Sequence, residues 1–145
     1  MVTTFRSATE HDIDWLVELR AEVLRTDLER LGRYDPHRVR QRMRDAYVPA
    51  STRVVVVDGA EVGCVTVRSE ADARWVEHLY LAPGVQGRGI GSEVLQTVLA
   101  GEDPRPTRLN VLQGSPARRL YERHGFTVDA EDEVDVFMTR PGGTA

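Results

Sequence analysis

Cysteine is nearly absent from this sequence, because Cys64 is the single one in 145 residues. One thiol excludes an internal disulfide and a cysteine-rich metal site. Cys64 lies in the strand-like run EVGCVTV, where a small buried hydrophobic residue is the expected role. The four histidines also lack metal-ligand spacing such as H-x-x-x-H, so the sequence predicts no metal site.

Long apolar runs are absent as well. No segment approaches the roughly 20 apolar residues that a transmembrane helix needs. The first residues, MVTTFRSATEHD, lack the apolar stretch of a signal peptide, so we expect a cytoplasmic protein. The formal net charge is -4, which argues against a broad surface for nucleic acid or an anionic membrane. The composition leaves the oligomeric state open between monomer and homodimer.

What is present is typical of one globular domain. Hydrophobic residues make up 41% and charged residues 29% of the chain. The length suits a single core, and neither internal repeats nor a low-complexity linker divide it. We therefore expect one domain over residues 1–145, with a frayed tail at 140–145.

The order of the predicted elements defines the fold class. Apolar periodicity and turn signals give the order βααβββαβαββ. Strands are expected at 3–9, 52–58, 61–69, 74–81, 106–112 and, as a closing pair, within 126–140; helices are expected from 9 to about 30, at 36–47, at 92–100 and at 115–125. This order predicts a mixed α/β fold with helices packed on a central, mostly antiparallel sheet.

The second predicted helix, PHRVRQRMRDAY, is rich in arginine at alternate positions: Arg38, Arg40, Arg42 and Arg44. Such a run resembles a binding patch. A solvated helix face explains it more simply, and that is the interpretation adopted from the sequence.

The run VQGRGIGSEV, residues 85–94, holds three glycines at alternate positions between a predicted strand and a predicted helix. Glycines at Gly87, Gly89 and Gly91 let consecutive backbone N–H groups point into one concavity. The helix adds its free N–H groups and the positive end of its dipole, and Arg88 adds a full charge. The segment therefore predicts a phosphate site.

Two common phosphate motifs do not fit this run. A mononucleotide-binding loop needs Gly-Lys-Ser/Thr, whereas Gly91 is followed by Ser92 and Glu93. The dinucleotide pattern G-x-G-x-x-G also fails, because the last glycine position, counted from Gly87, is Ser92.

The segment LYLAPGVQGRGIGSEVL resembles the acetyl-CoA signature of the GNAT superfamily of N-acetyltransferases, Gln/Arg-x-x-Gly-x-Gly/Ala, which Gln86, Gly89 and Gly91 satisfy. A second block, SPARRLYERHGF, is similar to the short helix with a tyrosine that ends at Gly-Phe in that family. The two blocks follow in the family's order and spacing, and the order of elements fits its fold.

The resemblance implies a coenzyme A site. In this family the pyrophosphate lies on the glycine loop, the pantetheine arm pairs with the end of the preceding strand, and a splay separates that strand from the next. Relatives carry an asparagine where this chain has Ser115. The implied cofactor-binding residues are Leu79, Tyr80, Leu81, Gln86, Gly87, Arg88, Gly89, Ile90, Gly91, Ser92, Asn110 and Ser115.

Acetyl transfer also needs a proton acceptor and a proton donor, because a protonated amine has no lone pair and a thiolate must leave. Tyr121 matches the tyrosine that serves as the acid in many relatives. The adjacent Glu77 and His78 should point to opposite faces of their strand. We favour Glu77 as the base, on the face of Trp75; an ion-paired carboxylate and ordered water are the alternatives.

The resemblance therefore implies an acetyl-CoA-dependent N-acetyltransferase that transfers directly to a primary amine in a ternary complex. The alternatives are a catalytically silent coenzyme A sensor and an interaction domain without a ligand. The acceptor pocket is expected between the first two helices, their loop with Arg33 and Tyr34, and the final hairpin. The five carboxylates of residues 129–135 attract a cationic amine or form a solvated turn.

Overall fold

The computed structural model describes residues 1–143 and is built around one seven-stranded sheet with the order β1-β2-β3-β4-β5-β7-β6. Neighbouring strands are antiparallel except for β4 and β5, which are parallel. The strands are β1 (Thr3–Ser7), β2 (Thr52–Val57), β3 (Ala60–Ser69), β4 (Arg74–Leu81), β5 (Thr107–Leu112), β6 (Thr127–Glu131) and β7 (Asp135–Arg140).

Four α-helices cover this sheet. They are α1 (Ile13–Arg30), α2 (Pro36–Ala46), α3 (Ile90–Leu99) and α4 (Ala117–Arg123), and short 3-10 turns lie at Glu10–Asp12, Pro49–Ser51 and Pro83–Val85. The predicted order of strands and helices and the mostly antiparallel sheet are confirmed. Among the described residues, no helix has both the length and the apolar character needed to cross a membrane.

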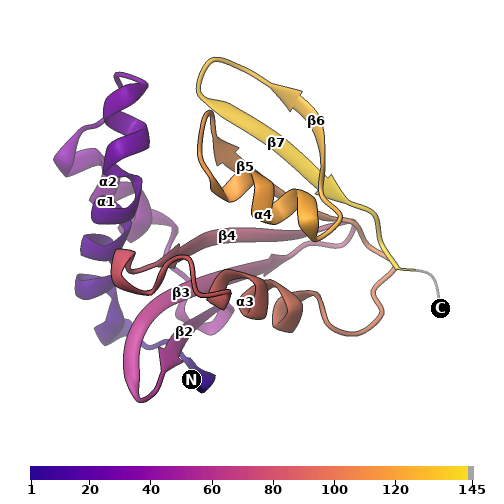
Figure 1. Cartoon of the computed structure of the whole chain (residues 1–145), viewed down its shortest axis with the longest axis horizontal. Coiled ribbons are helices and arrows are strands. Elements are labelled where there is room, and N and C mark those ends of the chain that lie inside the picture. Colours follow the sequence, from indigo (N-terminus) through magenta and orange to yellow (C-terminus); the bar gives the residue numbers. More distant parts are fainter. Residues whose placement is uncertain (144–145) are drawn as a thin grey trace.

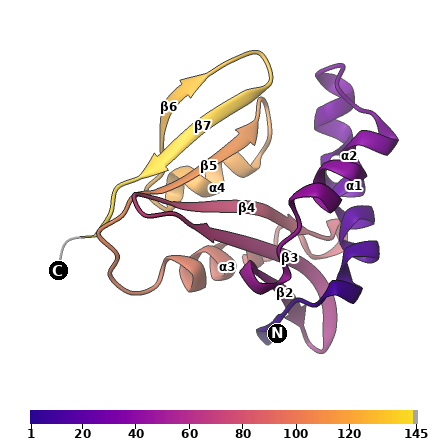
Figure 2. The ribbon, with the colours of Figure 1, turned by 180° about the vertical axis from the view of Figure 1, so that it is seen from behind.

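The helices lie on opposite faces of the sheet, and each face has its own core (Figures 1 and 2). Helices α3 and α4 cover one face, where Ile90, Leu95 and Phe126 are almost fully buried in the larger cluster. On the other face α1 and α2 pack against β3 and β4, with Leu16 and Met43 at the centre of the second cluster. Burial of apolar area on both faces is the main stabilising term.

The sheet is divided between β4 and β5. These strands pair only where they begin, with Arg74 opposite Thr107 and Trp75 opposite Arg108. Beyond that point they diverge, so β5, β7 and β6 form a second wing that tilts away from β1–β4 (Figures 1 and 2). The remaining length of β4 therefore has a strand partner, β3, on one side only.

A bulge interrupts β4 at His78. This residue has a backbone φ of 49°, in the left-handed region that non-glycine residues rarely adopt. The register with β3 shifts at the same place, from Glu77 opposite Thr66 to Tyr80 opposite Cys64. The regular alternation expected along this strand is wrong beyond Glu77, because the inserted residue changes the direction of the side chains that follow.

The chain end beyond β7 is tied to the loop before β5. Arg140 is the last residue of β7, and the Gly143 N–H donates to the Asp103 carbonyl at 2.8 Å. Of the tail predicted at 140–145, residues 144 and 145 lie outside the described residues.

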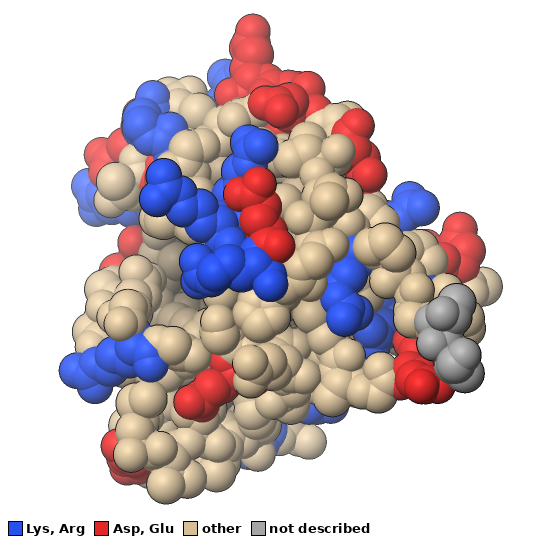
Figure 3. Space-filling model, turned by 45° about the vertical axis from the view of Figure 1, so that its right-hand side comes forward, with Lys and Arg blue, Asp and Glu red and all other residues tan. Residues whose placement is uncertain are grey.

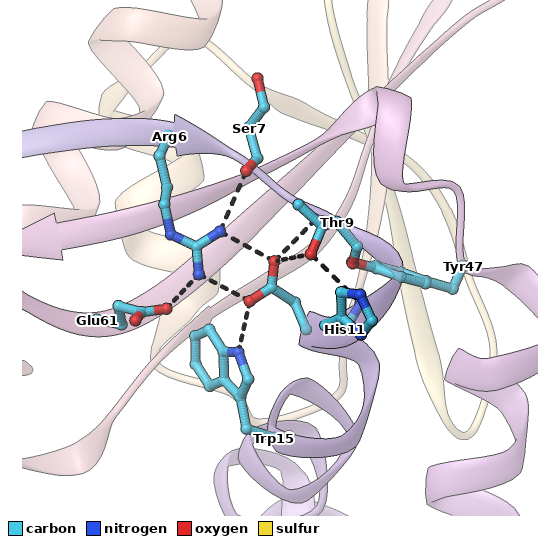
Figure 4. Close-up of polar contacts among 8 residues, drawn as sticks. Arg6, Ser7, Thr9, His11, Trp15, Tyr47 and Glu61 are labelled. Carbon is cyan, nitrogen blue, oxygen red and sulfur yellow. Dashed lines mark hydrogen bonds and ion pairs between the residues drawn. The ribbon is translucent and has the colours of Figure 1, made fainter.

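The carboxylate of Asp12, whose side chain is only 8% exposed, fixes the junction of β1 and α1 (Figure 4). The Arg6 guanidinium donates to both of its oxygens, at 2.9 and 2.7 Å, and also bonds Glu61 on β3. The Trp15 indole and the Thr9 backbone N–H donate to it at 2.9 and 2.8 Å. The guanidinium, with these donors, holds the pKa of Asp12 well below its usual range.

We expect Asp12→Asn to lower the free energy of unfolding by about 2 kcal/mol at pH 7, because several charge-assisted hydrogen bonds weaken. The lowered folded-state pKa makes this contribution fully present above the unfolded pKa of about 3.9, and it is lost progressively as the pH falls from there through the folded-state pKa. Urea unfolding should therefore show a smaller difference in the free energy of unfolding between the wild-type protein and Asp12→Asn at pH 3 than at pH 7.

Asp14→Asn is the matched control on the same helix turn. Asp14 also pairs with an arginine, Arg44, at 3.1 Å, but its side chain is 86% exposed. Exposed pairs contribute little, so this variant should lose less than about 1 kcal/mol. Equal losses for the two variants, or a gap for Asp12→Asn that stays constant from pH 7 to 3, would contradict the assignment.

Candidate active site

A cavity of about 1000 Å³ lies where β4 and β5 part, between the glycine loop, α4 and the first two helices. Figure 3 shows a hollow on this side of the molecule with basic side chains gathered beside it. The cavity brings together most of the residues predicted from the sequence. Those that line it are Glu77, Leu79, Tyr80, Leu81, Gln86, Gly87, Gly89, Gly91, Ser92, Asn110, Ser115 and Tyr121.

The glycine loop presents bare backbone to this cavity. Gly87 and Gly89 have φ angles of 79° and 80°, and a Cβ at either would meet no atom within 4 Å. The glycines are thus required by backbone conformation, and they leave the approach to the start of α3 open. Gly91 has a different role: its Cβ would lie 2.9 Å from Leu120 Cδ2 of α4, so a larger residue would require the Leu120 side chain to move.

The first turn of α3 has no side-chain cap on its N–H groups. Gly89 is the N-cap residue and makes no side-chain hydrogen bond. Free N–H groups and the positive end of the helix dipole favour an anion at this position. Two predicted cofactor-binding residues do not line the cavity with the others: Arg88 is exposed beside the loop, and the side chain of Ile90 is 1% exposed in the core. Only the backbone of Ile90 can reach a ligand.

The end of β4 offers a backbone edge to the cavity. Because β5 has diverged, residues Leu79–Leu81 face an open gap and not a neighbouring strand. The Gln86 amide donates to the Leu81 carbonyl at 2.9 Å and ties the glycine loop to this edge. An extended ligand could pair with such an edge as an added strand does.

The polar residues predicted on the far wall are held by neighbours. Asn110 donates through Nδ2 to Asp135 Oδ1 at 3.1 Å. Ser115 Oγ accepts the Ala117 N–H at 3.2 Å, just before α4 begins. Ser92 Oγ lies 3.2 Å from His124 Nε2. These contacts fix the orientation of the side chains before a ligand arrives.

Tyr121 is buried on α4 while its hydroxyl is left without a partner. Its ring stacks edge to face on Phe126, with centroids 5.9 Å apart. Among residues 1–143, no group forms a hydrogen bond with the hydroxyl, and the residue lines the cavity. Burial raises the pKa of Tyr121 well above its ordinary value, so the hydroxyl is protonated at neutral pH.

Glu77 lies on β4 with one carboxylate oxygen occupied. Arg68 donates to Oε1 through Nε at 3.1 Å and through Nη2 at 3.0 Å. Within the described part of the chain, Oε2 has no hydrogen-bond partner, and the residue lines the cavity. The ion pair orients the carboxylate and leaves this second oxygen available to a water molecule or a ligand.

The bulge brings His78 to the α1 side of the sheet. Its Nδ1 lies 3.0 Å from the Tyr80 hydroxyl, which accepts a hydrogen bond from Arg20 Nε on α1 at 3.0 Å. The expectation that His78 packs on the opposite face is therefore wrong. Burial, and next the Arg20 charge, lower the pKa of His78, so its imidazole is neutral at pH 7.

Several arginines of this site were not predicted from the sequence. Arg20 fixes Tyr80 and Arg68 holds Glu77, while Arg38 and Arg42 of α2 line the cavity. The two arginines of α2 are exposed, as a solvated face would be, and they border the cavity as well. Contacts between side chains on different strands or helices leave no pattern in the local sequence from which they could be predicted. The spacing of four between Arg38 and Arg42 does place them on one side of α2, which was the signal available.

The predicted acceptor pocket matches the lining in part. Arg33 lines the cavity, as do Asp132 and Asp135 of the acidic hairpin. Tyr34 does not, because its ring lies under the Arg25 guanidinium at 5.0 Å. Among the described residues, no group of three or more His, Cys, Asp and Glu side chains is placed to hold a metal ion.

Cys64 is buried beneath the bulge. Its Sγ donates to the His78 carbonyl at 3.1 Å, and burial raises the pKa of the thiol to about 12. A thiol in this environment stays protonated and is not a nucleophile at neutral pH.

Similar folds occur among solved acetyltransferase structures. A PaiA N-acetyltransferase from Thermoplasma acidophilum, in complex with coenzyme A, has a TM-score of 0.70 at 18% identity, over 97% of this chain and 99% of that one. Ard1 from Thermoplasma volcanium has a TM-score of 0.69 at 19% identity, over 99% of this chain and 100% of that one. An N-acetyltransferase from Staphylococcus aureus Mu50 has a TM-score of 0.71 at 16% identity, over 94% of this chain and 98% of that one. At such identities the likeness shows the fold.

A search of curated proteins found no match. A family model described as acetyltransferase (GNAT) domain matches residues 50–128, which is more than half of the 145 residues. That match covers β4, the glycine loop, α3, β5 and α4, which form part of the cavity; α1, α2 and the β6–β7 hairpin, which also line it, fall outside the matched residues except for the start of β6. The chain therefore belongs to the GNAT acetyltransferase family.

Proposed function

We propose that the protein transfers the acetyl group of acetyl-CoA to a primary amine by direct attack in a ternary complex. The observation that carries the proposal is the cavity itself. Three features border the same cavity: the first turn of α3, which has no side-chain cap and lies behind the open glycine loop; the Tyr121 hydroxyl; and Oε2 of Glu77. Neither of these two side-chain oxygens has a hydrogen-bond partner among the described residues. Membership of the GNAT family and the coenzyme A bound in the similar PaiA structure support it.

The groups present fit coenzyme A in three respects. The N–H groups at Gly89 and the first turn of α3 suit the pyrophosphate, and the exposed Arg88 adds charge beside them. The backbone edge of Leu79–Leu81 suits the amides of the pantetheine arm. An arm held there would extend along the gap between β4 and β5, whose wall includes Tyr121.

In the reaction that follows, the amine nitrogen attacks the thioester carbonyl carbon. A C–N bond forms, the C–S bond breaks, and the coenzyme leaves as a thiol once its sulfur is protonated. Tyr121 supplies that proton, because its hydroxyl lines the cavity, carries a proton at neutral pH and has no hydrogen-bond partner among the described residues. Direct transfer is favoured over an acetyl-enzyme because the single cysteine is a buried, protonated thiol.

The proton of the attacking amine goes to Glu77, directly or through a water molecule. Oε2 carries this role, since Arg68 occupies Oε1 only. His78 is the second candidate, because the bulge brings it to the same cavity and its neutral ring can accept a proton. The Tyr80 hydroxyl occupies Nδ1, so Nε2 is the atom of His78 that a substrate could meet.

The coenzyme site is tested by Gly89→Glu, which places bulk and negative charge against the pyrophosphate. We expect calorimetry to detect no binding of acetyl-CoA by the folded variant. Gly59→Glu is the matched control: Gly59 has a φ of 83° and equally open space around its Cβ, but it lies in the β2–β3 turn away from the cavity. If the folded Gly89→Glu variant binds acetyl-CoA with unchanged affinity, the proposed coenzyme site is wrong.

The acid is tested by Tyr121→Phe, which keeps the ring packed on Phe126 and removes only the hydroxyl. Turnover should fall by about 10²–10⁴-fold, the usual contribution of a general acid, while the affinity for acetyl-CoA barely changes. Tyr47→Phe is the control, since that hydroxyl bonds the Thr9 carbonyl outside the cavity. A rate within about threefold of wild type would remove Tyr121 from the mechanism, because that lies far below the expected effect.

The base is tested by Glu77→Gln and His78→Gln over a range of pH. If Glu77 takes the proton, its variant should be slow at neutral pH and recover in part at high pH, where free amine is abundant. His78→Gln should show no such recovery. The reverse pattern assigns the base to His78, and the absence of a pH-rescued defect in both variants assigns it to ordered water.

A further inference from the structure

The arginines of α2 divide into two sets with different surroundings. Arg40 and Arg44 face α1, where they pair with Glu18 at 2.6 Å and Asp14 at 3.1 Å. Arg38 and Arg42, which are four residues apart on the same helix, line the cavity instead. Their side chains have no acidic partner within 4 Å among residues 1–143.

A third arginine joins them at the same end of the cavity. Arg33, in the loop between α1 and α2, also lines it without an ion pair in the part of the chain that the structure describes. The acids nearest along this wall are already engaged, since Asp27 pairs with Arg30 at 2.7 Å and Glu77 with Arg68 at 3.0 Å. Arg20 and Arg123 also line the cavity and form no ion pair among residues 1–143. Together these cations attract an anion and repel a polycation.

This basic end lies next to the reacting centre. Arg20 bonds the Tyr80 hydroxyl and also the Val39 carbonyl of α2, so it joins α1, α2 and β4. Val39 is the neighbour of Arg38 in the chain, and Tyr80 contacts His78. A small molecule whose amine lies at Glu77 or His78 can therefore extend its other end toward α2.

We propose that the acceptor is a small primary amine that also carries a carboxylate, as an amino acid does, and that Arg38 and Arg42, with Arg33, bind that carboxylate. The inference rests on the proposed acetyl transfer. Arginine suits the role because its planar, permanently charged group can donate two parallel hydrogen bonds to a carboxylate. Asp132 and Asp135 of the β6–β7 hairpin also line the cavity and keep their negative charge, although each accepts hydrogen bonds, from its own turn and from Asn110. They belong to a different element from α2, so the carboxylate is assigned to the arginines and not to the hairpin.

The first experiment compares matched acceptors. The protein and acetyl-CoA are incubated with an equimolar mixture of L-amino acids, with the corresponding amino-acid amides, and with spermidine, and N-acetyl products are measured by mass spectrometry. We expect amino acids to be acetylated in preference to their amides and to spermidine. Preference for amides or spermidine, or the absence of any acetylated amino acid, would overturn the carboxylate assignment.

The second experiment uses the double variant Arg38→Gln/Arg42→Gln with the best amino acid of that set. Its KM should rise by roughly tenfold or more, as expected for the loss of charge-assisted hydrogen bonds, with kcat little changed and the preference over the amide lost. Arg40→Gln is the matched control, on the same helix but outside the cavity, and should leave KM unchanged. An equal rise in both proteins would contradict the proposal.

Binding of acetyl-CoA to the same variants separates this inference from the function on which it rests. Unchanged affinity in Arg38→Gln/Arg42→Gln is expected, whereas a parallel loss would show that these arginines hold the phosphates of the coenzyme and would overturn the proposal. Failure of the wild-type protein to bind acetyl-CoA would refute the proposed function as a whole. If the protein acetylates amino-acid amides but not amino acids, the carboxylate-binding role of the arginines is wrong and the proposed acetyl transfer still stands.

Discussion

The early parting of β4 from β5 is the constraint on which the rest of the site depends. Two residue pairs hold the strands together at their start, and a cavity occupies the space beyond. The same divergence leaves one edge of β4 unpaired inside the molecule, directs the glycine loop toward the gap and allows α4 to place Tyr121 at its wall. Free strand edges are ordinarily a liability. Here the second wing of the sheet shelters this one from other chains.

Burial sets the protonation of the groups around this gap. Tyr121 and Cys64 both lose water, and the pKa of each rises, so each keeps its proton at neutral pH. His78 responds in the opposite direction because its charged form is the protonated one, and it stays neutral. The cavity thus holds one protonated hydroxyl and one neutral imidazole, while the carboxylate of Glu77 is held by a surface arginine. The same loss of water thus leaves the tyrosine and the thiol protonated and the imidazole unprotonated.

Local patterns were sufficient to predict the elements and the glycine loop. Apolar periodicity gave the strand and helix order, and the alternate glycines pointed to an anion site, since both depend on neighbours in the chain. The bulge at His78 had no such signal, because it depends on how β3 and β4 pair. For the same reason the Arg68 partner of Glu77 could not be predicted. The arginines of α2 are mostly exposed, as the solvated-face interpretation expected, but their division into two sets could not be predicted because it follows from where α1 and the cavity lie.

The left-handed backbone at His78 has a further consequence. A non-glycine residue in that region costs on the order of 1–3 kcal/mol, and such strain persists only where the surroundings enforce it. Here the Cys64 thiol holds the carbonyl of the bulge and the Tyr80 hydroxyl holds the imidazole. A glycine at this position would relax the backbone but would lose the imidazole. Position 78 is thus a point where thermodynamic stability and the chemistry of the cavity compete, and any selection for a more stable fold at this residue acts against the site.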